Sequence, residues 1–212
     1  MYRIFRFFAL LFVKLFFPYK IVNKKSAKIK GPCVVVCNHL SNTDCFMVGS
    51  CFFEKAYYLC KKEWFKHKIL AWFFSSCGAI PVDREGADVQ ALKTCLKTLK
   101  NGKKLIIFPE GTRNKTGERL LPIKGGAGVL AAKTGVNVVP MYIKEKSRIF
   151  RRNYLYVGEP IDMSEYFGKR VDRAAEEALA EKIREGILST GDKLDEYLEN
   201  KKGNADNGNY NR

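Results

Sequence analysis

Acidic residues are scarce in this chain of 212 residues. Asp and Glu number 22 against 38 Lys and Arg, which leaves a formal net charge of +16. A surplus of that size favours anionic partners such as nucleic acid, anionic lipid headgroups or phosphorylated metabolites. Composition alone does not choose among these partners, and a basic surface that serves only solubility stays open.

The sequence also lacks a CxxC pair and an apparent secretory signal. Its seven cysteines are odd in number, and nearly all have apolar neighbours, where a reduced cysteine behaves as a small buried hydrophobe. We therefore expect no disulfide framework and a reducing, cytoplasmic environment. A zinc site built from Cys33, Cys37, His39 and Cys45 would match none of the usual ligand spacings, so no metal is expected.

A hydrophobic run long enough to cross a bilayer is missing from the N-terminal segment. Its longest uninterrupted apolar run, residues 7–13, is far short of the about 20 residues that a spanning helix needs. Lys14 then interrupts the apolar character. At about 100° per residue, Arg3, Arg6 and Lys14 fall within one narrow arc, and most of the remaining circumference is aromatic or aliphatic.

This pattern predicts a helix that lies in the membrane interface, with its apolar side in the acyl region and its cations at the lipid phosphates. Further lysines extend the basic character downstream, at positions 20, 24, 25, 28 and 30. Two alternatives stay open: a tilted single span with snorkelling lysines, and an ordinary core helix. On the preferred interpretation the protein binds an anionic membrane surface and is peripheral or monotopic at the cytoplasmic face of the cell membrane.

From residue 33 onward, short β-type runs alternate with helical stretches. The runs are rich in β-branched or aromatic residues and are bounded by Gly, Pro or polar clusters. Strands are expected at 33–37, 57–60, 79–82, 105–108, 136–143 and 154–157. Helices are expected to begin near Asp44, Glu63, Asp88, Gly125 and Val171. The alternation predicts an α/β fold: a single layered domain with a largely parallel sheet flanked by helices.

Three segments follow from these patterns. Residues 1–30 form the membrane-associating segment, and residues 31–200 form the folded domain. Residues 201–212, rich in Asn and Gly and without periodicity, are expected to be a disordered tail. The charged helical region before this tail is expected to be interrupted at Gly186 and Gly191.

Asn38, His39 and Asp44 follow the strand expected to end at Cys37. In open α/β sheets, ligands bind beyond the carboxyl ends of the strands. A carboxylate five positions after an imidazole can hold one ring nitrogen while the other takes a proton from an attacking hydroxyl. This is the base-and-orienter half of a serine-protease triad, with the substrate's own hydroxyl in place of the serine. A helix cap beside a structural histidine explains the pair equally well on this evidence.

Two further segments place an arginine after a strand. In the stretch 78–85, the Arg84 guanidinium can hold a phosphate bidentately, and a surface ion pair is the alternative. In the stretch 108–113, FPEGTR, Gly111 allows a ligand close to the backbone, and Arg113 offers a second phosphate clamp. Glu110 either orients Arg113 or bonds to a glycerol hydroxyl, and an ordinary turn is the alternative. A fourth stretch, 138–142, is apolar and is expected to lie mostly in the core, with an acyl groove as the other possibility.

In this order and spacing, the segments resemble the four sequence blocks of the glycerolipid acyltransferase family, which includes the lysophosphatidate acyltransferases. The matching positions are Asn38, His39 and Asp44 for NHxxxxD; Gly78 and Arg84 for the second block; Phe108, Pro109, Glu110, Gly111, Thr112 and Arg113 for FPEGTR; and Pro140 for the fourth. Lys61 loosely resembles a lysine between the first two blocks. The run NKTGE after FPEGTR departs from the family's more Ser/Arg-rich stretch, so alternative acceptors stay open.

The resemblance implies transfer of a fatty acyl group from acyl-CoA or acyl-carrier protein to the sn-2 hydroxyl of 1-acyl-glycerol-3-phosphate, which gives phosphatidic acid. It implies no acyl-enzyme, no metal and no organic cofactor. By this resemblance His39 is the base and Asp44 holds it. The residues expected to bind the glycerol phosphate are Arg84, Glu110, Gly111, Thr112, Arg113 and Lys61.

Other functions stay open at this point. The acceptor is alternatively another lysophospholipid or a lyso-amino lipid, or His39 activates water in a thioester hydrolase. A non-catalytic module that binds anionic lipid or nucleic acid explains the charge but leaves FPEGTR unexplained. No nucleic acid is expected, because the chain lacks the aromatic and basic platform of such binders.

Overall fold

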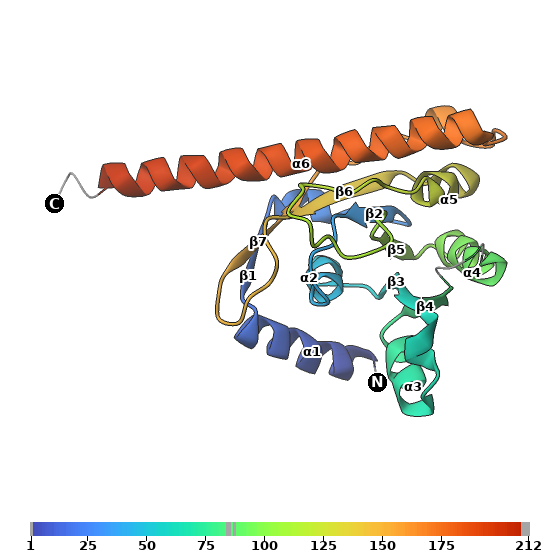
Figure 1. Ribbon diagram of the computed structural model, residues 1–212, viewed down its shortest axis with the longest axis horizontal. Coiled ribbons are helices and arrows are strands. Elements are labelled where there is room, and N and C mark those ends of the chain that lie inside the picture. Colours follow the sequence, from blue (N-terminus) through green and yellow to red (C-terminus); the bar gives the residue numbers. More distant parts are fainter. Residues whose placement is uncertain (1, 84–85, 87, 209–212) are drawn as a thin grey trace.

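A seven-stranded sheet forms the centre of the protein (Figure 1). The computed structural model describes residues 2–83, 86 and 88–208. The strand order is β1-β7-β6-β2-β5-β3-β4. The strands are β1 (Tyr19–Val22), β2 (Val34–Cys37), β3 (Ala56–Lys61), β4 (Ala79–Val82), β5 (Lys104–Ile107), β6 (Val138–Ile143) and β7 (Asn153–Val157). Every neighbouring pair is parallel except β6 and β7. The predicted α/β fold with a largely parallel sheet is confirmed.

Helices cover both faces of this sheet. They are α1 (Tyr2–Phe16), α2 (Asp44–Gly49), α3 (Lys68–Ser76), α4 (Val89–Lys100), α5 (Gly126–Thr134) and α6 (Arg173–Gly208). Asp88 caps α4 as expected, because its Oδ1 accepts the N–H of Ala91 at 2.8 Å. α5 ends at Gly135, which adopts the left-handed region with φ 68°. The helix expected from Glu63 starts later, since residues 62–65 form a 3-10 turn before α3.

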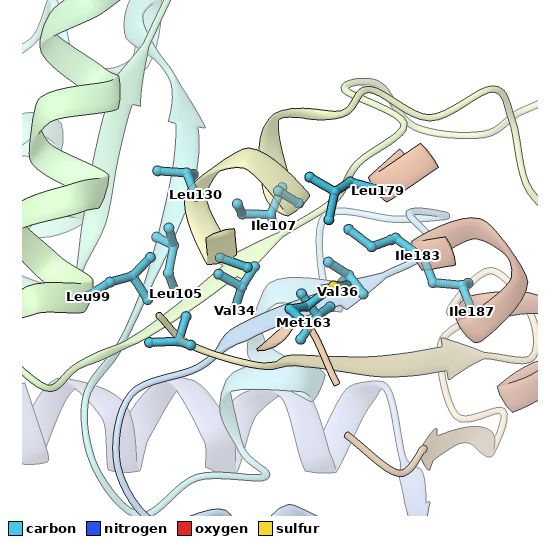
Figure 2. Close-up of a cluster of buried hydrophobic side chains, with 14 of the residues drawn as sticks. Val34, Val36, Leu99, Leu105, Ile107, Leu130, Met163, Leu179, Ile183 and Ile187 are labelled. Atoms are coloured by element: carbon cyan, nitrogen blue, oxygen red, sulfur yellow. The ribbon is translucent and has the colours of Figure 1, made fainter. Parts of the chain in front are cut away.

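The two faces of the sheet belong to different cores, because consecutive side chains of a strand point to opposite faces. In β2, Val34 and Val36 lie in the cluster that includes side chains of α4, α5 and α6, part of which Figure 2 shows. Val35 and Cys37 lie in the cluster that includes side chains of α2. Burial on both faces explains why β2 reads as an unbroken apolar run.

The sequence predicted breaks in the C-terminal helix at Gly186 and Gly191, but α6 runs through both. These glycines are points of close approach. A Cβ on Gly191 would lie 2.9 Å from Nη2 of Arg119 and 3.1 Å from the Tyr142 ring, and a Cβ on Gly186 would collide with the Ile161 side chain. Local propensity disfavours glycine in a helix, and tertiary packing overrides it here.

Two segment boundaries also differ from those expected. Residues 19–22 form β1, whose parallel partner is β7, so the folded domain begins well before residue 31. A four-residue strand paired with a segment far along the chain leaves no local signal. At the other end, α6 continues through residues 201–208, where a disordered tail was expected. Adding residues to the end of an existing helix requires no new nucleation, so even a polar sequence without periodicity can continue it. Residues 209–212 lie outside the described residues.

α1 lies on the same side of the sheet as α2 (Figure 1). Its inner side includes Val13, which is 3% exposed. The Arg6 guanidinium donates to the carbonyl oxygen of Phe53 at 2.9 Å and also to that of Phe52. The basic arc expected to face lipid phosphates therefore turns toward the protein at Arg6.

The outer side of α1 is apolar and exposed. It carries Phe7, Phe8, Leu11, Phe12 and Leu15, each more than half exposed. This exposure argues against an ordinary core helix. Across the described part of the chain, no helix has the length and apolar character to cross a bilayer.

Candidate active site

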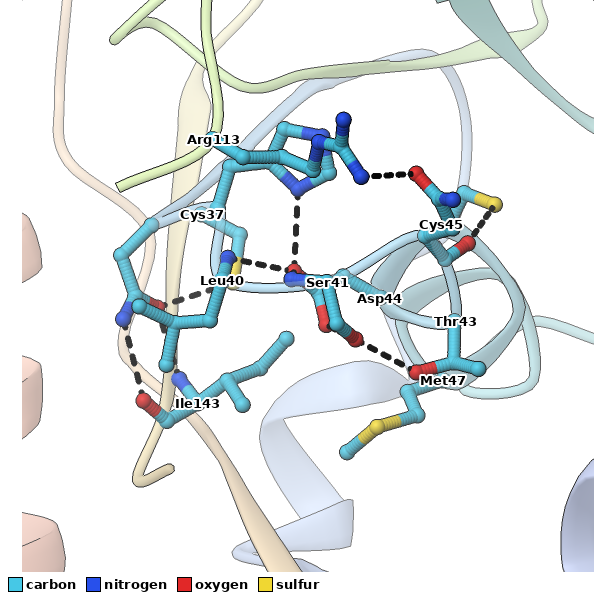
Figure 3. A network of polar contacts seen from close by, with 12 residues as sticks. Cys37, Leu40, Ser41, Thr43, Asp44, Cys45, Met47, Arg113 and Ile143 are labelled. Atoms are coloured by element: carbon cyan, nitrogen blue, oxygen red, sulfur yellow. Dashed lines mark hydrogen bonds and ion pairs between the residues drawn. The ribbon is translucent and has the colours of Figure 1, made fainter. Parts of the chain in front are cut away.

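His39 and Asp44 form the expected pair in the loop between β2 and α2. His39 Nδ1 lies 2.9 Å from Oδ2 of Asp44, the first residue of α2. The Asp44 side chain is fully buried, and its carboxylate also accepts the N–H of Leu40 at 2.6 Å and the N–H and hydroxyl of Ser41 at 2.7 and 2.9 Å (Figure 3). The local loop thus satisfies this buried carboxylate with four donors, which makes its position well defined.

The contacts of Asp44 fix which nitrogen of His39 is available. An ionised carboxylate only accepts hydrogen bonds, so Nδ1 carries the proton and Nε2 keeps its lone pair. The Phe108 ring stacks on the imidazole with 4.1 Å between centroids and 20° between planes. With one edge hydrogen-bonded and one face covered, the imidazole can accept a proton only at Nε2.

Asn38 joins the dyad loop to β6. Its side chain is fully buried, its Nδ2 donates to the carbonyl oxygen of Ile143 at 3.0 Å, and its Oδ1 accepts the Ile143 N–H at 2.8 Å. This pair continues the β2–β6 pairing one step past the strand end. Asn38 therefore places His39 relative to the sheet.

Glu110 lies beside His39 but contacts its main chain. Glu110 Oε1 accepts the N–H of His39 at 2.6 Å, and Oε2 accepts the N–H of Leu121 at 2.9 Å. Burial of the side chain raises the pKa of Glu110 above its ordinary value. Both oxygens accept from protein backbone, so Glu110 braces the loop, while Arg113 donates to Asn42. The contact with a glycerol hydroxyl that the sequence offered stays a prediction.

Arg113 faces an open cavity of about 830 Å³ on one side of the dyad loop. Its Nη1 donates to Oδ1 of Asn42 at 3.0 Å (Figure 3). The cations that line this cavity are Arg113, Lys115, Arg119, Lys144, Lys146 and Arg148. Arg119 and Lys144 pair with carboxylates of α6, whereas the other four have no carboxylate partner among the described residues. The cavity thus offers several cations to an anion.

A second cavity, of about 280 Å³, begins at His39 and is mostly apolar. It runs between the sheet and the two helices α4 and α5. Its apolar lining includes Leu59, Ala91, Cys95, Ile107 and Leu130. An imidazole at the mouth of an apolar cavity, with a cationic cavity on the other side of its loop, suits an amphiphilic substrate.

Lys124 is a cation of this second cavity that the sequence reasoning missed. It precedes α5, and its N–H donates to the carbonyl oxygen of Pro109 at 2.9 Å. Its side chain lies over Gly111, because a Cβ on that glycine would come within 3.3 Å of Lys124 Cε. Gly111 itself has φ +67°, so the turn favours glycine at this position. The sequence signal for Lys124 was its position as a single lysine in the Pro-Ile-Lys-Gly-Gly loop that precedes a predicted helix.

Lys61, Gly78 and Pro140 line neither cavity beside the dyad. Lys61 ends β3 and pairs with Glu63 at 3.1 Å. Gly78 has φ +94° and lies so close to β3 that a Cβ would be 2.7 Å from the Ala56 carbonyl oxygen. Pro140 is buried in β6, which confirms the core interpretation of that stretch. Thr112 is exposed in the loop after β5, and Arg84 lies outside the described residues.

The seven cysteines are free in the structure, and Cys33, Cys37 and Cys95 are buried. Burial raises the pKa of Cys45 and of Cys51 to about 12, and the pKa of Cys33 and of Cys95 to about 11. Within the described ranges, no group of three or more His, Cys, Asp or Glu side chains is arranged to hold a metal ion.

Known proteins resemble the chain over more than half of its length. A 1-acyl-sn-glycerol-3-phosphate acyltransferase of Bacillus subtilis is 29% identical over 84% of this chain and 90% of its own length. A chloroplastic 1-acyl-sn-glycerol-3-phosphate acyltransferase of Brassica napus is 38% identical over 56% of this chain, and a yeast protein of that name, from Saccharomyces cerevisiae, is 34% identical over 64%. The chain spans about a third of the length of the Brassica relative and just under half of the yeast one.

The fold has a solved counterpart. The crystal structure of the 1-acyl-sn-glycerophosphate acyltransferase PlsC from Thermotoga maritima superposes with a TM-score of 0.67, covering 89% of this chain and 78% of that chain at 24% identity. The family model described as Acyltransferase matches residues 19–144, which run from the start of β1 to just past β6 and contain both loops that meet at His39. Because this match covers more than half of the sequence, the chain belongs to the acyltransferase family.

Proposed function

We propose that the protein is a lysophosphatidate acyltransferase, which moves a fatty acyl group from a thioester to the sn-2 hydroxyl of 1-acyl-glycerol-3-phosphate and so makes phosphatidic acid. The observation that carries the proposal is the His39–Asp44 pair at the mouth of an apolar cavity. The relatives named for this reaction, one of them similar over 84% of the chain, support the choice of acceptor. The alternative acceptors are another lysophospholipid or a lyso-amino lipid.

His39 acts as the general base in this proposal. Its Nε2 takes the proton of the acceptor hydroxyl as the hydroxyl oxygen attacks the thioester carbonyl carbon. Asp44 stabilises the imidazolium that forms, through the 2.9 Å contact to Nδ1. When the carbon–sulfur bond breaks, the proton on Nε2 passes to the departing thiolate. The products are the ester and the free thiol, and no acyl-enzyme is formed.

The apolar cavity is the proposed place of the donor's acyl chain. Its lining by Leu59, Cys95 and Leu130 gives a hydrocarbon chain an apolar environment. With the chain inside, the thioester carbonyl stays at the mouth, beside His39. Lys124 lies at the same mouth, so its ammonium group is placed to stabilise the negative charge that develops on the carbonyl oxygen.

The acceptor phosphate belongs to the cationic cavity in this proposal. Arg113 lines this cavity and donates to Asn42 of the dyad loop, so it is the first candidate to hold the phosphate. Lys115 is a second cation of the same cavity. Lys61 and Arg84 stay proposals from the family resemblance, with Gly111 and Thr112 as loop residues near Arg113.

The donor's carrier, CoA or acyl-carrier protein, and the location of the protein complete the proposal. The acceptor is a lipid, and the exposed apolar side of α1 suits the membrane interface. We propose that α1 holds the protein, as a peripheral or monotopic protein, at the cytoplasmic face of the cell membrane. Deleting residues 1–19 should then reduce binding to anionic liposomes, although this deletion also removes the first residue of β1.

Release of thiol from a long-chain acyl-CoA, measured with and without lysophosphatidate, tests the reaction. We expect release that depends on the acceptor, with phosphatidic acid as the product. His39→Ala should abolish it, because no other described group replaces Nε2. His67→Ala is the matched control, since it changes the other of the chain's two histidines, an exposed residue that precedes α3.

Each outcome has a definite meaning. Thiol release that does not need an acceptor would identify a thioester hydrolase. No release from acyl-CoA calls for acyl-carrier protein as the donor, and then for other lyso-lipids as the acceptor. Failure with every combination, or full activity of His39→Ala, would refute the proposal.

A further inference from the structure

The loop between β6 and β7 ends in a tight turn that presents two apolar side chains to solvent. Ile149 and Phe150 are 62% and 70% exposed. Arg148 and Arg151 close the turn, with the Arg151 N–H donating to the Arg148 carbonyl oxygen at 3.2 Å. Turns are usually built from Gly, Pro, Asn, Asp and Ser, so an isoleucine followed by a phenylalanine is an unusual choice here.

The backbone of Phe150 is in an unfavourable region. Its φ is +57°, in the left-handed region, where a bulky side chain is rare. Among the described residues the only other non-glycine with positive φ is Asn23, a residue type that tolerates it. The fold fixes Phe150 in place, because its N–H donates to the carbonyl oxygen of Phe16 at 2.7 Å. The outward position of this side chain is therefore specified by the fold.

The turn continues the exposed side of α1. The Phe16 ring contacts that of Phe150 with 5.8 Å between centroids, and that of Phe12 with 4.7 Å. In Figure 1 the loop between β6 and β7 reaches the C-terminal end of α1. The seven exposed side chains of this joint surface are Phe7, Phe8, Leu11, Phe12, Leu15, Ile149 and Phe150. Two segments far apart in sequence thus form one apolar surface.

Exposed cations surround the apolar pair. They are Lys146, Arg148, Arg151 and Arg152, and none pairs with a carboxylate in the described ranges. An apolar tip with a cationic rim complements a bilayer that contains anionic lipid, where hydrocarbon lies below a layer of phosphates. A nucleic acid would use the cations and leave Ile149 and Phe150 in water.

We propose that the loop of residues 146–152 is a second bilayer contact, which extends the exposed apolar side of the N-terminal helix. Ile149 and Phe150 enter the boundary between acyl chains and headgroups, and Arg148, Arg151 and Arg152 bind the phosphates of anionic lipids. The placement has a consequence for the site. Arg148 of this loop and Arg113 line the same cationic cavity, so a loop bound to the bilayer would place part of the cavity wall beside the headgroups. An anionic lyso-lipid would then reach the dyad loop without leaving the surface.

Phe150→Gly separates membrane binding from folding. Glycine accepts positive φ, so this variant should unfold at the same temperature as the wild type or higher. Its affinity for vesicles of phosphatidylcholine with phosphatidylglycerol, measured by co-sedimentation, should fall about 10- to 100-fold, because a buried aromatic side chain is lost. Arg151→Gln should bind these vesicles about fivefold more weakly and bind pure phosphatidylcholine as the wild type does.

Val89→Ser is the matched control. Val89 is 58% exposed and begins α4, which packs on the other face of the sheet. Its removal should leave vesicle binding unchanged. Wild-type binding by Phe150→Gly would overturn the proposal, as would a loss of affinity no larger than that of Val89→Ser. A lipid-free wild type that self-associates through Phe150 would identify a second copy of the chain as the occupant.

A fluorescent probe tests insertion directly. Phe150→Trp, made in a protein with Trp64→Phe and Trp72→Phe, should show a blue shift on the anionic vesicles and quenching by brominated acyl chains. Val89→Trp in the same background should show neither. An unshifted spectrum from position 150 would overturn the proposal. None of these measurements uses donor or acceptor, so a protein that lacked acyltransferase activity could still bind as proposed, and the two proposals fail separately.

Discussion

Glu110 and His39 are joined through the main chain, with Glu110 Oε1 accepting the His39 N–H at 2.6 Å. The carbonyl oxygen of the same histidine accepts the N–H of Asn114 at 2.7 Å. The loop after β5 therefore holds both polar groups of the His39 backbone. The FPEGTR segment contributes to the geometry of the base, in addition to any contact it makes with substrate.

Glu110→Gln should lower both stability and turnover. The two Glu110 oxygens accept two backbone N–H groups, and an amide would turn its own NH₂ toward one of them. Leaving a buried donor unpaired costs about 1–3 kcal/mol of unfolding free energy. Chemical denaturation measures this loss, and kcat should fall with it. Glu118→Gln, at an exposed position of the same connection, is the control. Unchanged stability of Glu110→Gln would show that its carboxylate does not brace the loop.

Asp44→Asn should nearly abolish turnover. The Asp44 carboxylate accepts from His39, from two backbone N–H groups and from a hydroxyl, and an amide cannot accept from all four. His39 would lose the partner that fixes its tautomer, which costs a serine-protease triad about 10⁴-fold in kcat, and we expect a loss of about 10³- to 10⁴-fold here. Steady-state kinetics measures it, with circular dichroism to check folding. Asp192→Asn, an exposed partner of Arg119, should be active. Substantial kcat in a folded Asp44→Asn protein would contradict the dyad.

Lys124→Met should lower kcat about 100-fold while leaving the fold intact, if its ammonium group stabilises the developing oxyanion. The side chain is exposed at the cavity mouth, so little stability depends on it. Separate saturation curves for donor and acceptor test this. Lys133→Met, an exposed position on α5, is the control. A rise confined to the acceptor's KM would assign Lys124 to the phosphate instead.

The thiols of Cys45 and Cys51 should react slowly in the native protein. Burial raises the pKa of Cys45 and Cys51 to about 12, so at pH 8 only about one in 10⁴ of each is thiolate, the reactive form. Labelling by a disulfide reagent should speed up about tenfold per pH unit and become fast on unfolding. Single Cys-to-Ser variants should retain turnover. Loss of activity from one such change, with normal folding, would contradict transfer without an acyl-enzyme.

Gly128→Ala should destabilise the protein. Its added Cβ would lie 2.6 Å from Leu179 Cβ, so α5 and α6 would have to separate. Overpacking of this kind typically costs about 1–3 kcal/mol, more than the gain in helix propensity. Gly203→Ala on α6 is the matched control, because nothing lies within 4 Å of its added Cβ. We expect that control to be neutral or slightly stabilising in thermal unfolding. Equal stability of Gly128→Ala would mean that the two helices pack less closely than described.

Local sequence patterns predicted most of the sheet. The six predicted strands coincide with β2 to β7, because each is a short apolar or β-branched run between turn residues. β1 was missed. It has only four residues, and its partner β7 lies far along the chain, so it leaves no local signal of this kind. The breaks expected at Gly186 and Gly191 failed for a related reason. At each glycine a side chain from another segment of the chain lies so close that no Cβ fits, and helix propensity contains no information about such tertiary contacts.

The site divides in the same way. Spacing within one loop was enough to predict the His39–Asp44 contact, because two side chains five positions apart stay within reach of each other when the chain turns between them. The roles expected for Glu110 and Lys61 concern a bound substrate and stay predictions. The structure adds that Glu110 accepts from backbone and that Lys61 pairs with Glu63. Lys124 and the turn at Phe150 were not singled out. Their neighbours, Gly111 and Phe16, lie in other segments of the chain.

The sequence by itself determined the α/β class, the dyad and the family resemblance, because these depend on periodicity and on short-range spacing. Only the tertiary structure decided that His39 lies between a cationic and an apolar cavity, and that α1 and the turn after β6 share one exposed surface. The physical reason is the parallel sheet. It brings the carboxyl ends of strands from distant parts of the chain to one edge, and the order of those strands is fixed by packing on both faces rather than by any local pattern.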